Sequence, residues 1–303
     1  MARGTATWTV AAETLTDDVL EPLTRPRAAL AGLPADRTAV MGILNVTPDS
    51  FSDGGRHAAP GIAVAAARAM AAAGADIIDV GAESTRPRAP VVDLATERAR
   101  LAAVLPGLAG LAWSIDTRKA AVMAEALGAG AALVNDVSAL GHDPAALALV
   151  AARGCPVVLM HAQGTPETMQ VAPHYGDALL DVYDWLAARI AVCEAAGIAR
   201  DRIIADPGIG FGKNLAHNLA LLRGLTLFHG LDVRLLLGAS RKQLIARMVA
   251  PDGVAGAGDV PPDQRLPGSL ALALHAAACG VQIVRVHDVA ETVQALAVWR
   301  SAN

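Results

Sequence analysis

The sequence predicts an α/β protein built as a single (β/α)8 TIM barrel with an N-terminal extension. Eight short apolar runs are each followed by an Ala-rich stretch long enough to form a helix. This alternation is typical of parallel α/β folds. Polar residues follow every apolar run, as expected where the C-terminal ends of barrel strands carry an active site. An open doubly wound sheet is the alternative architecture for the same alternation.

The predicted strands have no polar face, which indicates burial on both sides. They cover residues 39–44, 76–81, 112–116, 131–135, 155–160, 202–206, 233–238 and 281–286. The stretches between and after them predict helices at 60–73, 94–105, 118–128, 143–152, 177–196, 215–223, 241–249 and 268–279. A last helix is expected over 288–300.

Residues 1–38 differ from the rest because Pro22, Pro26 and Pro34 interrupt any long helix. We expect these residues to form an extension that caps the barrel, and residues 39–303 to form one barrel domain. Barrels of about 250 residues commonly fold as one unit.

Bulk composition excludes several classes of partner. Hydrophobic residues make up 53% of the 303 residues, the mean hydropathy is +0.40 and the net charge is −4. This charge gives no electrostatic case for binding nucleic acid or a membrane. No apolar run approaches the roughly 18 residues of a membrane span, and we see no signal peptide. Three scattered cysteines fit buried thiols in a reducing compartment, so we expect a cytoplasmic protein.

Three polar residues directly terminate apolar runs: Asp116, Asn135 and Asp206. A buried, unpaired carboxylate costs several kcal/mol, so these groups are expected to have ligand partners. Two carboxylates and an amide suit a flat heterocycle, because carboxylates accept from adjacent N–H groups while Asn both donates and accepts. A metal site is the alternative, but the sequence shows no metal-ligand spacing of His residues.

Only three of the 25 basic residues are lysines: Lys119, Lys213 and Lys242. In a chain so rich in Arg, each Lys indicates a place that needs a compact ammonium. The segment 238–242 (GASRK) places Ser240 at a strand end that enters a helix, so we expect Ser240 to be the N-cap of that helix. The helix N-terminus, with the adjacent Arg and Lys, would attract an anion such as a carboxylate or a phosphate. An ordinary helix cap with solvated basic residues is the alternative there.

Three further segments carry candidate binding groups. The run from Val40 becomes a polar loop at Asn45 that contains Phe51, and the glycine-spaced segment 206–213 (DPGIGFGK) lets backbone approach a ligand while Phe211 covers a ring. Arg285 and His287 alternate on the last strand and so point the same way. With Asn45 they would hold a diphosphate through a divalent ion, although a basic pair on this strand could also be structural.

Nine motifs in order make the chain resemble the dihydropteroate synthase family from about Val40 to the C-terminus. They are MGILNVTPDSFSDGG at 41–55, GAESTRP at 81–87, SIDTRKA at 114–120, VNDVSAL at 134–140, LMHAQGTPETMQ at 159–170, ADPGIGFGK at 205–213, GASRK at 238–242, PGSLA at 267–271 and RVHDV at 285–289. The resemblance implies a transferase of folate biosynthesis in which 4-aminobenzoate displaces diphosphate from 6-hydroxymethyl-7,8-dihydropterin diphosphate. It also implies a cytoplasmic homodimer that is a sulfonamide target.

The resemblance assigns roles to fourteen residues. Pterin would be held by Asp116, Asn135, Met160, Asp206, Phe211 and Lys242, with Asp116, Asp206 and Lys242 acting in catalysis. The 4-aminobenzoate would meet Phe51, Thr85, Arg86, Pro87 and Ser240. The diphosphate would meet Asn45, Arg285 and His287, with Asn45 as the Mg2+ contact.

Three other functions fit parts of the same pattern. A pterin-dependent methyltransferase domain shares the pocket but is expected to lack the loop 47–55 and the Ser-Arg-Lys set. A non-catalytic pterin-binding paralogue is disfavoured by Asn45, Arg285 and His287. A phosphate-binding barrel aldolase would need a lysine within a strand, and no predicted strand has one.

Overall fold

The computed structural model describes residues 15–47, 59–84, 91–164, 168–169, 171–249 and 260–303. Eight parallel strands pair in sequence order and close into a barrel, because β1 pairs with both β2 and β8. The strands are β1 (Ala39–Asn45), β2 (Ile77–Gly81), β3 (Trp113–Asp116), β4 (Leu133–Asp136), β5 (Val157–Met160), β6 (Ile203–Asp206), β7 (Arg234–Leu237) and β8 (Ile283–Val286). The closed barrel confirms the predicted fold class and excludes the open sheet.

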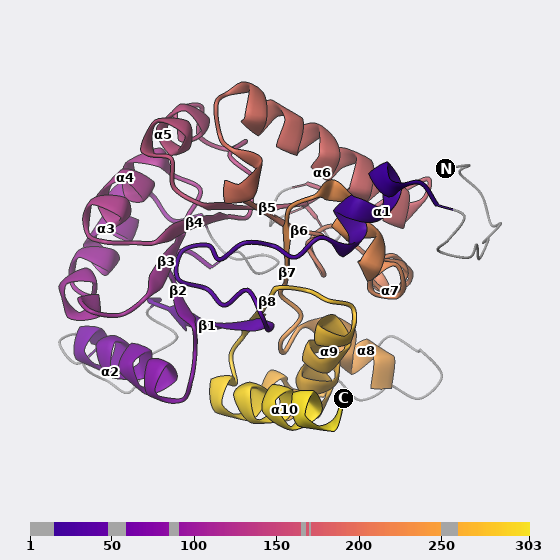
Figure 1. The fold of residues 1–303 in the computed structure, drawn as a ribbon. Helices are drawn as coiled ribbons and strands as arrows, with labels where there is room; N and C mark the ends of the chain where they lie inside the picture. Colours follow the sequence, from indigo (N-terminus) through magenta and orange to yellow (C-terminus); the bar gives the residue numbers. More distant parts are fainter. Residues whose placement is uncertain (1–14, 48–58, 85–90, 165–167, 170, 250–259) are drawn as a thin grey trace.

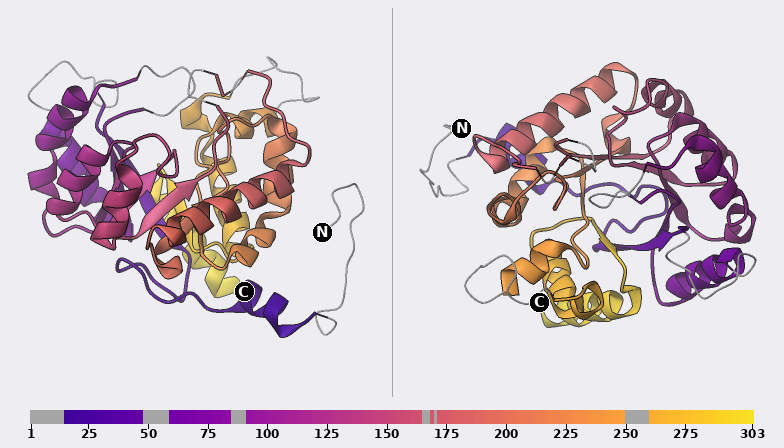
Figure 2. Two further views of the ribbon diagram at one scale, coloured as in Figure 1. Left: turned by 90° about the horizontal axis from the view of Figure 1, so that it is seen from above. Right: turned by 180° about the vertical axis from the view of Figure 1, so that it is seen from behind.

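Helices surround the barrel (Figures 1 and 2). They are α1 (Asp17–Thr24), α2 (Ala59–Ala72), α3 (Leu94–Ala102), α4 (Ala120–Gly128), α5 (Ala146–Arg153), α6 (Ala178–Ala195), α7 (Leu215–Arg223), α8 (Gln243–Val249), α9 (Leu266–Ala278) and α10 (Val289–Ala302). Short 3-10 helices occur at Leu105–Leu108, Arg200–Arg202, Leu225–Leu231 and Pro262–Gln264. In the described part of the chain, no helix combines the length and apolar character needed to cross a membrane.

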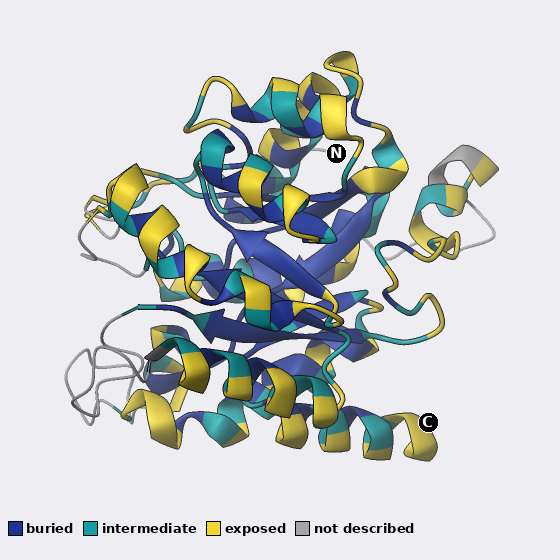
Figure 3. Ribbon diagram, turned by 90° about the vertical axis from the view of Figure 1, so that its left-hand side faces the viewer, coloured by how far each residue is buried: buried dark blue, intermediate teal, exposed yellow. Residues whose placement is uncertain are grey.

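Local chemistry explains where several helices begin and end. The Asp93 side chain caps α3 by accepting from the Thr96 N–H, and Asp177 caps α6 by accepting from the N–H groups of Leu179 and Leu180. At the other end of α5, Gly154 has a φ of 60°, a left-handed conformation that terminates a helix at little cost in glycine. Strand residues are buried, apart from the half-buried Asn45 and Arg285, while the outer helix faces are exposed (Figure 3).

The inside of the barrel has two layers of different chemistry. The lower, apolar layer consists of Ala39, Met41, Ile77, Leu133, Val158, Ile204, Leu236 and Ile283. Side chains two residues further along a strand point to the same face. Those positions carry Asp79, Asn135, Met160, Asp206 and Arg285 on five of the strands. Polar side chains therefore point into the C-terminal half of the barrel, next to the lower apolar layer.

The N-terminal segment covers the N-terminal end of the barrel, next to the lower apolar layer. Leu30 and Leu33 are buried against the lower apolar layer, and the segment crosses one end of the barrel (Figure 2). Arg25 and Arg27 both form ion pairs with Asp232, which fixes the segment to the start of β7. These contacts fit a capping role, while the division of the chain at residue 38 stays a prediction.

Candidate active site

A cavity of about 460 Å3 opens at the C-terminal ends of the strands. Seven of the fourteen predicted site residues line it: Asn45, Asp116, Phe211, Ser240, Lys242, Arg285 and His287. A neighbouring cavity of about 270 Å3 shares Phe211 and is lined by Met160. The structure therefore brings together residues separated by up to 242 positions between Asn45 and His287.

The buried carboxylates and amide lie at one level of the barrel. Asp116 pairs in register with Asn135, and Met160 pairs with Asp206. Burial raises the pKa of Asp116 to about 7, although Arg285 opposes this shift. Burial also raises the pKa of Asp206, against the opposing charge of Lys242. Both acids thus sit where a ligand that donates hydrogen bonds would stabilise their ionised forms.

Asp79 is a buried acid that the sequence analysis missed. It is fully buried in the middle of β2, where its carboxylate accepts from Ser114 Oγ at 2.6 Å, Asn135 Nδ2 at 2.8 Å and Arg285 Nε at 2.6 Å. The predicted site residues lie at or after the ends of strands, whereas Asp79 lies two residues before the end of β2. A charged residue inside an otherwise apolar strand was the available signal.

Arg285 connects two of these acids. Its Nε donates to Asp79, and its Nη2 donates to Asp116 at 2.8 Å. The sequence analysis assigned Arg285 to the diphosphate alone, whereas the structure gives it a second role in neutralising buried carboxylates. Because the guanidinium is planar and rigid, two carboxylates fix its orientation.

Lys242 lies beside Asp206 and Phe211. A Cβ placed on Gly238 would lie 3.9 Å from Asp206 Oδ2 and 4.0 Å from Lys242 Nζ, so the absence of a side chain at Gly238 keeps this corner open. The ammonium donates to the Ile209 carbonyl and lies 4.5 Å from the centroid of the Phe211 ring. Burial lowers the pKa of Lys242 to about 8, partly offset by the charge of Asp206.

Two glycines of segment 206–213 are required by the packing of the protein. A Cβ on Gly208 would lie 1.9 Å from the His161 carbonyl oxygen, and one on Gly212 would lie 2.4 Å from the Gln163 carbonyl oxygen. Gly210 lines the larger cavity, so the expectation that backbone of this segment approaches a ligand stays a prediction. Only at Gly210 would the added atom find ordinary contact, 3.4 Å from the Lys242 side chain.

Lys213 holds this segment from inside. Its ammonium is buried and donates to the carbonyls of Gly208 and Phe211, both at 2.9 Å, while the His161 carbonyl, 3.3 Å away, shares one of its three N–H groups. It also lies 2.9 Å from His161 Nδ1. Burial and this cation lower the pKa of His161 to about 3, so the imidazole is neutral and accepts. A compact ammonium suits this ring of acceptors, as the scarcity of lysine suggested.

We predict that Gly208→Ala destabilises the protein by about 3 kcal/mol or more, because Gly208 has a left-handed conformation and the new methyl group must also displace the His161 backbone. The φ of Gly208 is 69°. Gly154→Ala is the matched control: its φ is 60° and nothing lies within 4 Å of the added atom. That substitution is expected to cost only the backbone strain, about 1 kcal/mol. Urea titration of both variants measures the difference, and equal losses would contradict the packing explanation.

Ser240 is not a helix cap, which corrects the sequence prediction. Helix α8 begins at Gln243, and Arg241 between them adopts a left-handed conformation with a φ of 56°. The Ser240 hydroxyl instead accepts from the His287 N–H at 3.2 Å and lies 3.1 Å from His287 Nδ1. Arg241 forms an ion pair with Asp288. The contacts of Ser240 and Arg241 therefore link the residues that follow β7 to those that follow β8.

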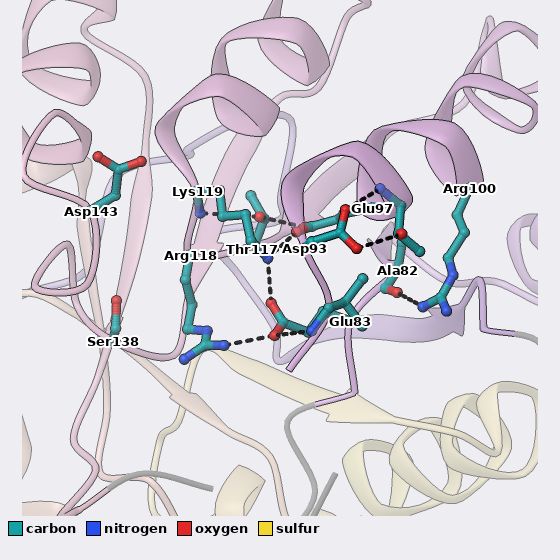
Figure 4. A network of polar contacts seen from close by, with 12 residues as sticks. Ala82, Glu83, Asp93, Glu97, Arg100, Thr117, Arg118, Lys119, Ser138 and Asp143 are labelled. Atoms are coloured by element: carbon teal, nitrogen blue, oxygen red, sulfur yellow. Dashed lines mark hydrogen bonds and ion pairs between the residues drawn. The ribbon is translucent and has the colours of Figure 1, made fainter. Parts of the chain in front are cut away.

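A network of charged side chains supports the ends of β2 and β3 (Figure 4). Glu83 lines the larger cavity and pairs with Arg118 at 2.7 Å and Lys119 at 2.8 Å. Lys119 also pairs with the buried Glu97 at 2.5 Å, and Glu97 accepts from the Thr117 hydroxyl. These pairs lower the pKa of Glu83 against the effect of its burial. The residues that follow Asp116 are therefore held to helix α3.

Four predicted contacts to the second substrate, Phe51, Thr85, Arg86 and Pro87, lie outside the described residues. Their assignments stay predictions. Among the described residues, no group of three or more His, Cys, Asp or Glu side chains is arranged to hold a metal ion. Mg2+ bound with substrate phosphates commonly uses only one or two protein ligands. The amide oxygen of Asn45, in the same cavity as Arg285 and His287, is a hard donor that fits this mode of binding.

The chain is a closed barrel with buried acids, an amide and basic side chains at the C-terminal ends of its strands, and the model of the family described as pterin binding enzyme matches residues 41–287. The chain is 48% identical to the dihydropteroate synthase of Escherichia coli (strain K12) over 86% of this chain and 89% of that one. It is 44% identical to that of Neisseria meningitidis serogroup B (strain ATCC BAA-335 / MC58), over 88% and 93%. The chain belongs to the dihydropteroate synthase family.

Solved structures agree with this assignment. The dihydropteroate synthase of Yersinia pestis in a sulfonamide drug complex has a TM-score of 0.82 and 46% identity, covering 91% of this chain and 98% of that one. The Xanthomonas albilineans enzyme with 4-aminobenzoic acid has a TM-score of 0.82 and 45% identity, with coverage of 92% and 98%. Another structure of the same enzyme contains 7,8-dihydropteroate.

Proposed function

We propose that the protein condenses 4-aminobenzoate with 6-hydroxymethyl-7,8-dihydropterin diphosphate to give dihydropteroate and diphosphate, as a transferase of folate biosynthesis. The observation that carries this function is the juxtaposition of Asp116 with Lys242, Arg285 and His287 around one cavity. Such a site offers acceptors to a flat ring and cations to its leaving group. Membership of the dihydropteroate synthase family supports the same reaction.

The pterin ring is expected to meet Asp116, Asn135 and Asp206 along its polar edges. These residues lie at one level of the barrel, and Lys242 lies close to Asp206. Met160 and Phe211, which line the same neighbouring cavity, would contact the faces of the ring. Asp116, Asp206 and Lys242 are the groups we assign to catalysis.

The diphosphate is expected to meet Asn45, Arg285 and His287. Two nitrogens of Arg285 are bonded to Asp79 and Asp116, which leaves Nη1 for a phosphate oxygen. Mg2+ fits beside Asn45, where it would neutralise charge on the departing diphosphate. The 4-aminobenzoate is assigned to Ser240, Phe51, Thr85, Arg86 and Pro87.

The chemistry needs little acid or base catalysis. An aniline nitrogen is neutral at pH 7, so it forms a bond to the pterin methylene carbon without losing a proton first, as the bond from that carbon to the diphosphate oxygen breaks. The anilinium that results then releases its proton to solvent or to the departing diphosphate. Departure of diphosphate is the harder step, and Arg285, His287 and Lys242 stabilise the negative charge that develops on it. Positive charge on the pterin methylene is stabilised by the nearby carboxylate of Asp116. Alignment of both substrates supplies much of the remaining acceleration.

We predict a bell-shaped pH dependence of kcat/KM for the pterin substrate. Asp116 must be ionised to accept from the ring, so the rate constant falls as the pH drops below about 7, the value to which burial raises the pKa of Asp116. Lys242 must be protonated, so the rate constant also falls above about 8, the lowered pKa of this ammonium. Initial rates at limiting pterin substrate across pH 5 to 10 measure both limbs. A flat profile between pH 5 and 7 would contradict the role of Asp116.

Diphosphate release with and without 4-aminobenzoate tests the function itself. A synthase releases diphosphate only when both substrates are present. A pterin-binding protein without catalysis, or a pterin-dependent methyltransferase domain, would release none under either condition. Inhibition of the two-substrate reaction by a sulfonamide that competes with 4-aminobenzoate is the expected companion result.

Three broader assignments belong to the same proposal. We propose that the protein is a homodimer, which the resemblance to the family supports. We also propose that it is cytoplasmic, which fits its three unpaired cysteines. We also propose that residues 1–38 form a capping extension and residues 39–303 form the pterin-binding barrel. The packing of Leu30 and Leu33 against the barrel supports this division.

A further inference from the structure

Asp79 contacts three other strands of the barrel although it does not line either cavity described above. Its partners are Ser114 on β3, Asn135 on β4 and Arg285 on β8. A fully buried carboxylate is costly unless it is paired and hydrogen-bonded. Two of its three partners are side chains that the proposed function assigns to the pterin and the diphosphate, so the position of this charge bears directly on the site.

The contact with Asp79 determines what Asn135 offers to a ligand. An ionised carboxylate only accepts hydrogen bonds, so the amide group that faces Asp79 must be the NH2 group. The Nδ2 to Oδ2 distance of 2.8 Å agrees with this orientation. The amide oxygen of Asn135 is therefore directed away from Asp79, and a ring edge that meets this oxygen must supply an N–H donor.

The same carboxylate holds Arg285 between two acids. Arg285 donates from Nε to Asp79 and from Nη2 to Asp116. The charged groups that act on Asp116 come from four elements: Arg285 on β8, Asp79 on β2, Asp136 on β4 and Glu97 on α3. Arg285 is the only cation among these four groups, and Asp116 shares it with Asp79. Because Asp79 also repels Asp116, the negative charge of Asp79 raises the pH at which Asp116 ionises.

We propose that Asp79 is a positioning residue for the reaction, which fixes the Asn135 amide and the Arg285 guanidinium so that the pocket accepts a ring edge carrying N–H donors. This inference rests on the proposed function, because it concerns how the same site selects and orients its pterin substrate. Asp79 acts through its neighbours and does not itself contact the ring.

The test is the pH dependence of Asp79→Asn, which removes the charge and keeps the shape. We expect KM for the pterin diphosphate to rise at least about tenfold, since Asn135 loses its fixed orientation. The KM for 4-aminobenzoate is expected to stay within about twofold, because Asp79 reaches neither cavity wall. The acid limb of kcat/KM is expected to move to lower pH, because Arg285 then pairs with Asp116 alone.

A second variant gives the opposite direction. Arg285→Met removes the cation and leaves Asp79 beside Asp116, so the ionisation of Asp116 moves to higher pH. Arg285 is also assigned to the diphosphate, so this variant is tested with 6-hydroxymethylpterin, which carries no phosphate. Fluorescence titration at a series of pH values measures its affinity for this pterin. Ser114→Ala is the control for the acid limb of the kcat/KM profile, because it removes one hydrogen bond to Asp79 but no charge.

The outcomes separate this inference from the function it rests on. A wild-type protein that releases no diphosphate with both substrates overturns the proposed function. A wild-type protein that turns over, together with an Asp79→Asn variant whose acid limb and pterin KM are unchanged, overturns the role of Asp79 alone. Shifts of the Asp116 ionisation in the same direction in Asp79→Asn and Arg285→Met would also overturn it. A purely structural role would lower the unfolding midpoint of Asp79→Asn without moving the limb.

Discussion

Replacing Asp116 with alanine is expected to lower kcat/KM for the pterin diphosphate by about two to three orders of magnitude. The variant loses a buried, charge-assisted contact to the ring, a class of interaction that contributes about 1.5–3 kcal/mol. It also releases Arg285 from one of its two carboxylates. Both losses act in the transition state, where positive charge on the pterin methylene needs a nearby anion, so kcat is expected to fall together with kcat/KM.

The control for Asp116→Ala is Glu125→Ala. Glu125 lies on α4, the helix that follows Asp116, and its exposed side chain pairs with Arg98. Exposed ion pairs contribute about 0–1 kcal/mol, so this variant should retain wild-type kinetics. Steady-state rates with each substrate varied in turn make the comparison. Turnover of Asp116→Ala near that of the control would remove Asp116 from the mechanism.

Replacing Lys242 with alanine is expected to weaken both substrates. Its ammonium lies near Asp206 in the barrel and contacts the Phe211 ring above the cavity. Loss of the cation leaves Asp206 with less opposing charge, which raises the pKa of an acid already raised by burial. We expect kcat/KM to fall about 100-fold or more for the pterin substrate, with a smaller rise in KM for 4-aminobenzoate.

The matched control for Lys242→Ala is Arg223→Ala, which removes an exposed cation at the end of α7. Steady-state kinetics and isothermal titration of both variants with a pterin separate substrate binding from turnover. If Lys242→Ala raised only one of the two KM values, the prediction that this lysine supports the binding of both substrates would be wrong.

The architecture could be predicted from sequence because it depends on local patterns. Each strand is a short apolar run, and each observed strand begins and ends within two residues of its expected position. Asp116, Asn135 and Asp206 were identified because each ends or nearly ends such a run. Closure of the barrel then brings these positions together, as the rule for barrel active sites requires.

What sequence could not supply are features that depend on contacts between distant segments. Asp79 is explained only by its partners on β3, β4 and β8. The need for Gly208 arises from the backbone of His161, 47 residues earlier. The left-handed conformation of Arg241, which separates Ser240 from α8, has no local sequence signal because Arg is not a residue that favours it.

The central claim is that buried acids at one level of the barrel hold the pterin while a cationic wall receives its diphosphate. A crystal structure of the protein with a pterin tests this claim most directly. We expect ring N–H groups within hydrogen-bonding distance of Asp116 and Asp206, an N–H donor at the Asn135 amide oxygen, and the 6-substituent directed toward Arg285 and His287. A pterin bound elsewhere, or one whose 6-substituent points away from Arg285 and His287, would contradict the account.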